Sequence, residues 1–218
     1  TWALQDALTM PDRDITHNYG SLNTNGKYVK VSRFISNSYN VRSLIFGSST
    51  IEIGSSNCYY CNYPCDLSGA NLTLNAGTSV LKLTGTPATA NFGSVALNDI
   101  QFTNNTVGAY GDLHGSPTSI HDLTFSGDAF IFASTTFNNV SIAGNGYFNV
   151  SDTLNNLNLA AGKTYNFSNG TTLTFNGTLT ANGTCSAPTE LFCQTGNATF
   201  FKSSGAITVS YVRLKNIH

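Results

Sequence analysis

Two carboxylates, Asp99 and Asp122, occupy the same place in two copies of a short repeated pattern. If successive copies stack, these side chains come close enough to share a proton or to bind a metal ion, as acid–base pairs do. The next copies carry Asn139 and Asn156 at this place, which favours a turn ladder in which Asp and Asn are interchangeable. His121 precedes Asp122, but neighbouring strand residues point to opposite faces. The sequence therefore predicts no catalytic residue, no metal site and no cofactor.

The five cysteines fall into two groups, Cys58, Cys61 and Cys65 in one segment and Cys185 and Cys193 in another. The spacing of the first two resembles a zinc knuckle or a redox pair. A zinc site has no fourth ligand nearby, however, and a redox pair normally precedes a helix, of which the sequence gives no sign. We therefore predict disulfides of an extracellular loop. Cys185 and Cys193 flank a short loop and are expected to pair with each other, which leaves an odd cysteine among the other three.

The same segment carries Tyr59, Tyr60 and Tyr63. Tyrosine rings offer an apolar face with a polar tip, so they can stack on sugar rings. The alternative is that they cover the flank of the fold. If this chain binds a glycan, these three residues are the predicted site.

The elements that position these residues follow a six-residue pattern: apolar, Asn or His, Asn or Asp, apolar, polar, apolar. Its four copies are residues 97–102, 120–125, 137–142 and 154–159, so they start 23, 17 and 17 residues apart. A strand-sized unit recurring at this period indicates stacked coils. We predict an all-β fold, a parallel β-helix (β-solenoid) of about ten coils of roughly 17–23 residues. Parallel stacking would align Asp99 with Asp122, and the residues before them with one another.

The pattern also divides the chain. Residues 1–56 are expected to form N-terminal coils or a cap, residues 57–68 a Cys- and Tyr-rich loop insertion, and residues 69–218 the regular coils. The last residues read as a strand in mid-pattern, so we expect the solenoid to continue beyond the end of the chain. Its partners would then include neighbouring segments of a longer parent protein.

Composition narrows the function classes. Of the 218 residues only 10% are charged, and the net charge is −1. Nucleic-acid binding requires a basic face, which this chain lacks. No run of about 18 apolar residues is present, so no membrane span is predicted. Few charges together with many β-branched and aromatic residues favour strands.

Residues 69–218 resemble the Asn/Thr/Gly-rich repeats of very large cell-surface proteins of the Bacteroidetes. The segments that carry this resemblance are residues 71–79, 137–140, 154–157 and 202–212. That group includes gliding-motility adhesins and other surface proteins exported by type IX secretion. The resemblance implies a secreted, modular adhesin on a bacterial cell surface with a β-helical stalk. It carries over no catalytic residues.

Three functions remain open at this point. The first is a non-catalytic segment of such an adhesin, a stiff stalk for which surface polysaccharide is a candidate ligand. The second is a polysaccharide lyase or glycoside hydrolase of β-helix type, for which the sequence offers only scattered carboxylates such as Asp99, Asp122 and Asp128. The third is an ice- or crystal-binding face, suggested by the threonines of residues 171–174.

Overall fold

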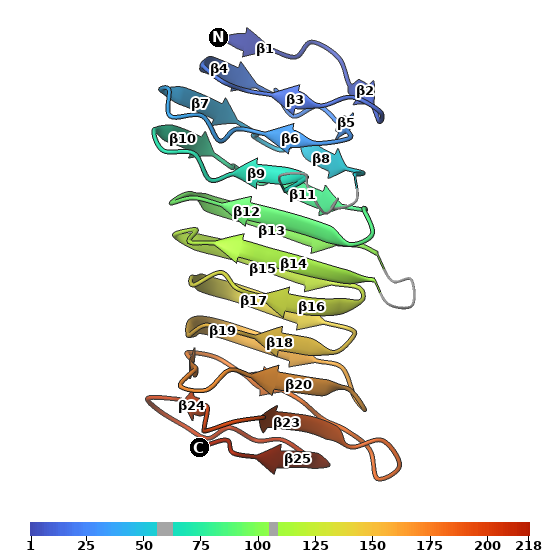
Figure 1. Ribbon diagram of the computed structural model, residues 1–218, viewed down its shortest axis with the longest axis vertical. Coiled ribbons are helices and arrows are strands. Elements are labelled where there is room, and N and C mark those ends of the chain that lie inside the picture. Colours follow the sequence, from blue (N-terminus) through green and yellow to red (C-terminus); the bar gives the residue numbers. More distant parts are fainter. Residues whose placement is uncertain (56–62, 105–108) are drawn as a thin grey trace.

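The computed structural model describes residues 1–55, 63–104 and 109–218, and it shows an all-β molecule in which every strand pairing is parallel. The strands stack along one long axis, with the two termini at opposite ends (Figure 1). The predicted parallel β-solenoid is confirmed. The part of the chain described here contains no helix with the length and apolar character needed to cross a membrane.

The strands form three sheets, here named A, B and C. Sheet A contains β1 (Trp2–Ala3), β4 (Gly20–Asn23), β7 (Arg42–Ile45) and β10 (Leu72–Asn75). Sheet B contains β2 (Leu8–Met10), β5 (Val29–Val31), β8 (Thr50–Ile53), β11 (Val80–Leu83), β13 (Ala96–Phe102), β15 (Ser119–Phe125), β17 (Thr136–Ile142), β19 (Asp152–Leu159), β21 (Thr172–Phe175), β22 (Leu179–Thr180) and β24 (Thr199–Phe201). Sheet C contains β3 (Ile15–Thr16), β6 (Phe34–Ile35), β9 (Cys65–Leu67), β12 (Ala88–Phe92), β14 (Tyr110–Gly115), β16 (Asp128–Ile131), β18 (Gly146–Phe148), β20 (Thr164–Phe167), β23 (Thr189–Cys193) and β25 (Val212–Lys215).

The order of the strands defines the coils. Sheet C has 10 strands, one from each coil, and each coil also places a strand in sheet B. The first four coils add a third strand, in sheet A, which ends at β10. In the next four coils a single long strand (β13, β15, β17 and β19) replaces the strands of sheets A and B.

This replacement changes how the chain turns the corner. In the second, third and fourth coils the corner contains Gly26, Gly47 and Gly77, all at positive φ (70°, 58° and 57°). Glycine adopts this left-handed conformation without steric cost. In the following coils the corner is a bend inside the strand, where two successive side chains face outward between two buried ones, such as Asn98 and Asp99 in β13. This bend is the physical basis of the apolar, polar, polar, apolar start of the repeated pattern.

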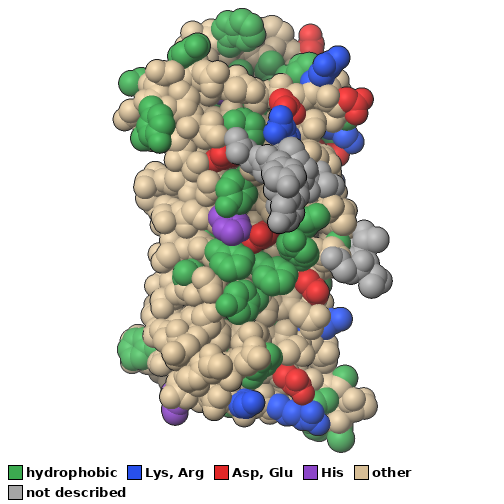
Figure 2. Space-filling view, in the orientation of Figure 1, with side chains coloured by type: hydrophobic (Ala, Val, Ile, Leu, Met, Phe, Trp, Pro, Cys, Tyr) green, Lys and Arg blue, Asp and Glu red, His purple; other side chains and the backbone are tan. Residues whose placement is uncertain are grey.

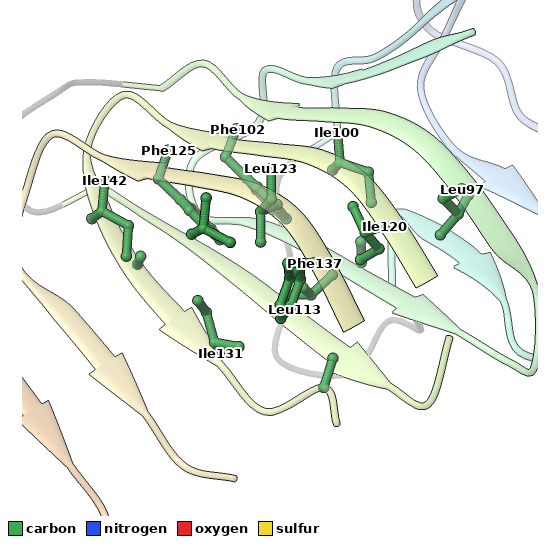
Figure 3. Close-up of a cluster of buried hydrophobic side chains, with 14 of the residues drawn as sticks. Leu97, Ile100, Phe102, Leu113, Ile120, Leu123, Phe125, Ile131, Phe137 and Ile142 are labelled. Carbon is green, nitrogen blue, oxygen red and sulfur yellow. The ribbon is translucent and has the colours of Figure 1, made fainter. Parts of the chain in front are cut away.

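The interior is a continuous apolar column between sheets B and C (Figure 3). The rings of Phe102 and Phe125, in adjacent coils, stack with centroids 4.5 Å apart and planes 6° from parallel. Gly111 in the facing strand β14 makes room for them, because a Cβ there would lie 2.6 Å from a carbon of each ring. The register of the coils is therefore fixed by aromatic packing as well as by backbone hydrogen bonds.

A charged side chain is also buried, at the start of β7 in sheet A. Arg42 is 1% exposed. Its Nη2 donates to the carbonyl oxygens of Ser36 (3.0 Å) and Gly69 (3.3 Å). Its Nη1 donates to those of Asn40 (2.7 Å) and Ala70 (3.1 Å). The guanidinium thus satisfies buried carbonyl groups of two consecutive connections between sheets C and A, as buried polar groups require.

The predicted loop insertion of residues 57–68 extends too far. Residues 65–67 form β9, which pairs with β6 and β12 in sheet C. Cys65 and Leu67 are both fully buried, so residues 65–67 belong to the solenoid coil and not to a loop insertion. Residues 56–62 lie outside the described residues.

The glycine corner makes a first prediction. Gly77→Ala should lower the free energy of unfolding by about 2–5 kcal/mol, since the residue must keep a left-handed φ and its Cβ would overlap the backbone of Gly47. Gly170→Ala is the matched control, because Gly170 also has a positive φ (78°) but has nothing within 4 Å of the added Cβ. That variant should lose only about 1–2 kcal/mol. Urea unfolding of both variants checks this, and equal losses would contradict the proposed coil-to-coil contact.

Candidate functional site

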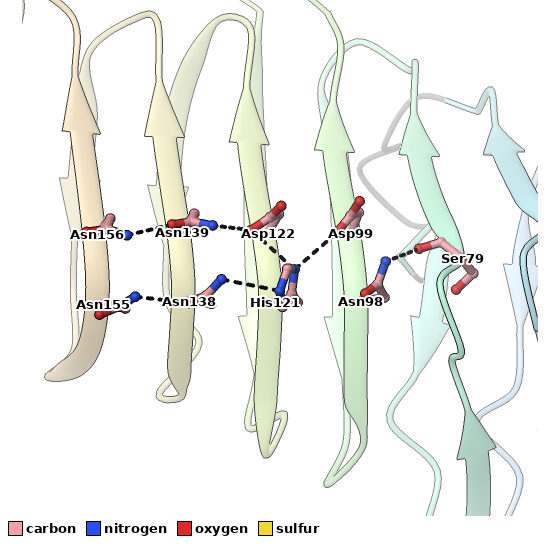
Figure 4. Close-up of polar contacts among 9 residues, drawn as sticks. All are labelled: Ser79, Asn98, Asp99, His121, Asp122, Asn138, Asn139, Asn155 and Asn156. Atoms are coloured by element: carbon pink, nitrogen blue, oxygen red, sulfur yellow. Dashed lines mark hydrogen bonds and ion pairs between the residues drawn. The ribbon is translucent and has the colours of Figure 1, made fainter. Parts of the chain in front are cut away.

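The repeated Asp and Asn residues lie in register on the outer bend of sheet B (Figure 4). Asp99 pairs with Asp122, Asp122 with Asn139, and Asn139 with Asn156. They lie within strands rather than in turns, which corrects the prediction of a turn ladder. We call these four residues the inner ladder.

The inner ladder is hydrogen-bonded in one direction. The Thr178 hydroxyl donates to Asn156 Oδ1 (2.8 Å), Asn156 Nδ2 donates to Asn139 Oδ1 (2.8 Å), and Asn139 Nδ2 donates to Asp122 Oδ1 (2.7 Å). A carboxylate only accepts hydrogen bonds, so this series of donors ends at Asp122. The next position is Asp99, a second acceptor.

A second row of side chains, the outer ladder, consists of Asn98, His121, Asn138 and Asn155. Asn155 Nδ2 donates to Asn138 Oδ1 (3.1 Å), and Asn138 Nδ2 lies 3.3 Å from His121 Nε2. Asn98 Nδ2 donates instead to the carbonyl oxygen of Ser79 (3.1 Å).

His121 points to the same side as the two carboxylates, so the expectation that it faces away was wrong. Its Nδ1 lies 3.3 Å from Asp122 Oδ1 and 3.6 Å from Asp99 Oδ1. The reason is the bend in β15, where His121 and Asp122 both face outward between the buried Ile120 and Leu123. Simple alternation fails wherever a strand turns a corner.

The electrostatics of this group favour a positive charge between the carboxylates. Burial raises the pKa of Asp99, and the neighbouring Asp122 carboxylate raises it further. Contact with His121 lowers the pKa of Asp99 again, because the imidazole stabilises the ionised carboxylate. Asp99, His121 and Asp122 thus form a small cluster of oxygen and nitrogen donors at the surface.

A second feature lies on the outer side of sheet C. Six half-buried rings form what we call the aromatic face, and they are Tyr63, Tyr110, His114, Phe130, Phe132 and Tyr147. His114 and Phe132 stack in parallel (centroids 4.8 Å apart, 12° between planes), and Phe132 meets Tyr147 at 5.8 Å. Figure 2 shows hydrophobic side chains gathered beside a histidine on this side of the molecule.

Polar groups border the aromatic face. Asp112 Oδ1 lies 2.9 Å from His114 Nε2. The Tyr147 hydroxyl lies 2.7 Å from Ser168 Oγ and donates to Asn149 Oδ1 (3.0 Å). An apolar centre with hydrogen-bonding groups at its edge is the usual composition of a small-molecule binding surface.

Sequence reasoning found only one residue of this face. Tyr63 was a predicted ligand-binding residue, and its ring lies 5.1 Å from that of His114. Tyr59 and Tyr60 lie outside the described residues. Tyr110 and His114 lie at outward positions of β14. The pairing of β14 with β16, and of β16 with β18, brings them together with the rings of Phe130, Phe132 and Tyr147. The signal in the sequence was the alternation of aromatic residues with buried ones in residues 110–114 and 128–132.

The predicted Cys185–Cys193 disulfide is not formed. Cys193 is buried at the end of β23, and its Sγ donates to the carbonyl oxygen of Thr195 (3.1 Å), whereas Cys185 is exposed. Cys185 lies at the surface in the loop before β23, whereas the Cys193 thiol points into the core. Cys65 is also a free thiol whose pKa is raised by burial. Cys58 and Cys61 lie outside the described residues.

A third feature is a shallow groove lined by hydroxyl groups of successive coils, among them Ser134, Thr135, Ser151 and Thr172. Asp152 lines this groove and is only 4% exposed. Its Oδ1 accepts a hydrogen bond from the backbone N–H of Thr135 (3.0 Å), while its Oδ2 has no hydrogen-bond partner. Burial raises the pKa of Asp152 to about 7.

Comparison of the chain with protein-family models, with curated proteins and with solved structures found no match.

Asp152 makes a pH-dependence prediction. Its pKa is about 7 in the folded protein against an ordinary value of 3.8, so the folded state holds this proton more tightly than the unfolded state. Because of this group, the free energy of unfolding should then fall by at most about 4 kcal/mol as pH rises from about 4 to about 7. Above pH 7 it should stay level. Asp152→Asn should remove this loss and be more stable than the wild type at pH 8.

The measurement is urea unfolding at pH 4–8 of the wild type, Asp152→Asn and the control Asp6→Asn, which alters an exposed carboxylate. At each pH, the free energy of unfolding of each variant is compared with that of the wild type. A pH-independent difference for Asp152→Asn would show that Asp152 is ionised in the folded protein throughout this range.

Proposed function

We propose that this protein is a non-catalytic, glycan-binding segment of a bacterial cell-surface adhesin, in which a rigid β-solenoid presents a carbohydrate-binding surface. The single observation that carries this proposal is the aromatic face of sheet C. The secreted, cell-surface location rests on the resemblance of residues 69–218 to repeats of Bacteroidetes surface proteins.

Sugar rings have apolar C–H faces and a rim of hydroxyl groups. The rings of His114 and Phe132 stack face to face and therefore present apolar ring edges at the surface, and Asp112 lies beside them as a hydrogen-bond acceptor for a sugar hydroxyl. Strands in the sheet are about 4.8 Å apart, so a polysaccharide lying along the solenoid axis would cross several coils and contact rings from each. Repeated contacts of this kind add avidity without new chemistry.

Charge indicates which glycans bind. Among the described residues, the acidic groups near the aromatic face include Asp112 and Asp66, which both act on Tyr63, and Asp128, which is paired in register with Tyr110. Carboxylates repel uronic acids and sulfated sugars but accept hydrogen bonds from neutral sugar hydroxyls. The expected ligand is therefore a neutral polysaccharide.

The continuous core supports the proposed stalk role. Each coil packs against its neighbours through backbone hydrogen bonds and side-chain columns, as in other solenoids. Such a body holds the binding rings at fixed spacing, which reduces the entropy lost on binding.

A β-helix glycoside hydrolase is the second candidate, and the contact between Asp112 and His114 favours it. A carboxylate next to an imidazole beside a sugar-binding surface resembles an acid–base pair. Glycoside hydrolysis normally uses two carboxyl groups flanking the scissile bond. The catalytic proposal therefore depends on measured turnover.

The test is a glycan array followed by titration of the best neutral polysaccharide. Phe132→Ala and His114→Ala should each weaken binding by about fivefold to thirtyfold, since an aromatic contact contributes on the order of 1–2 kcal/mol. Tyr39→Ala is the control, because Tyr39 is 84% exposed and takes no part in the aromatic face.

Three outcomes decide between the candidates. Binding that is lost in the two variants and kept in the control, without release of new sugar ends, supports the non-catalytic proposal. Release of new sugar ends that Asp112→Asn abolishes would favour the hydrolase. Binding that both aromatic-face variants retain, or no binding on the array, would contradict a glycan site on sheet C.

A further inference from the structure

We propose that Asp99, His121 and Asp122 bind a divalent transition-metal ion of the Zn²⁺ type on the outer bend of β13 and β15. One donor atom from each residue lies within 4.8 Å of the other two. This site is on sheet B, whereas the aromatic face is on sheet C, so the proposal is independent of glycan binding.

The spacing of the donors fits a shared ion. Zinc takes nitrogen and oxygen ligands at about 2.0–2.2 Å, which places neighbouring ligands of a tetrahedral site about 3.4 Å apart. His121 Nδ1 lies 3.3 Å from Asp122 Oδ1 and 3.6 Å from Asp99 Oδ1. Only small side-chain rotations would be needed to bring all three donors to bonding distance.

The hydrogen-bond pattern leaves Asp99 Oδ1 without a donor in the described part of the chain, while Asp122 Oδ1 accepts one hydrogen bond, from Asn139, and keeps a second lone pair. The donors of the inner ladder end at Asp122, and the next position in register is another acceptor, Asp99. Asp99 Oδ1 is buried and has no hydrogen-bond partner among the described residues. Two carboxylates in adjacent coils repel each other, and a dication between them would remove that repulsion while supplying the missing contact.

The second nitrogen of His121 is placed to support a metal-binding tautomer. A histidine that binds metal through Nδ1 carries its proton on Nε2 and normally donates it to an oxygen. Nε2 lies 3.3 Å from the Asn138 amide, which here presents Nδ2 to it. Rotation of the Asn138 amide would present Oδ1 instead, and Asn155, which donates to Asn138 Oδ1, would reorient with it. Metal binding would thus reverse the direction of the hydrogen bonds that link Asn155, Asn138 and His121 in the outer ladder.

Exposure indicates the type of site. The His121, Asp122 and Asp99 side chains are 57%, 39% and 29% exposed. Solvent can reach the ion, so water would complete a coordination shell with three protein ligands. Imidazole together with carboxylate suits Zn²⁺ and its neighbours better than Ca²⁺ or Mg²⁺.

The test is calorimetric titration of the intact protein with ZnCl₂, with nitrogen-detected NMR of the histidine rings as the direct readout. We expect one ion per chain and a change of His121 to the tautomer with Nε2–H and metal on Nδ1. Asp99→Asn, His121→Asn and Asp122→Asn should each weaken binding at least tenfold. Asp99→Asn and Asp122→Asn should fold, since Asn occupies the same position in the next two coils.

Two control variants separate this site from other metal-binding groups. Asp128→Asn makes the same charge change on sheet C, and His114→Asn removes an imidazole next to a carboxylate there. Both should bind zinc as the wild type does. Zinc binding that survives in Asp99→Asn and His121→Asn would place the ion elsewhere, for example on cysteine thiols, and would overturn the proposal. So would the absence of any binding.

Discussion

In-register parallel stacking is the constraint on which the rest of this molecule depends. Each side chain lies beside its counterpart in the coil before and the coil after, about 4.8 Å away along the sheet. A residue type is therefore acceptable only if it is compatible with its neighbours in the same column. Inside the solenoid this condition is met by stacked rings such as Phe102 and Phe125. Where a ring needs more space, as near Phe125, the facing strand supplies Gly111.

On the outside, the same condition separates amides from carboxylates. An amide has both a donor and an acceptor, so Asn139 and Asn156 can repeat along a column without loss of hydrogen bonds. A carboxylate can only accept, so it ends such a series, and a second carboxylate beside it is repelled. The pair Asp99 and Asp122 is tolerated because His121 reaches into the space between the two carboxylates. The electrostatic stress of parallel stacking is thus concentrated at one surface position, where a cation has the most to contribute.

The sequence predicted the stacking but not the direction of every side chain. The six-residue pattern was sufficient for the parallel solenoid, for about ten coils and for the alignment of Asp99 with Asp122, because these depend on period alone. It failed for His121, since period-2 alternation does not hold through a bend with two outward residues. It also failed for the Cys185–Cys193 pair, because proximity in sequence did not reveal that Cys193 is buried at the end of β23 while Cys185 is exposed in the preceding loop. The aromatic face was missed because its rings come from different coils and become neighbours only through the register of sheet C.

Both candidate surfaces follow from that register. A column of outward positions converts residues far apart in sequence into a row with fixed spacing, and the apolar interior keeps this row from adjusting independently. On sheet C the row contains packed rings, whose regular spacing suits the repeating units of a polymer. On sheet B it contains a break in an amide ladder, which suits a single ion. A solenoid of this kind can therefore present unrelated ligand surfaces on different sides without any change in its core, because only the inward-pointing side chains of each strand contribute to the core.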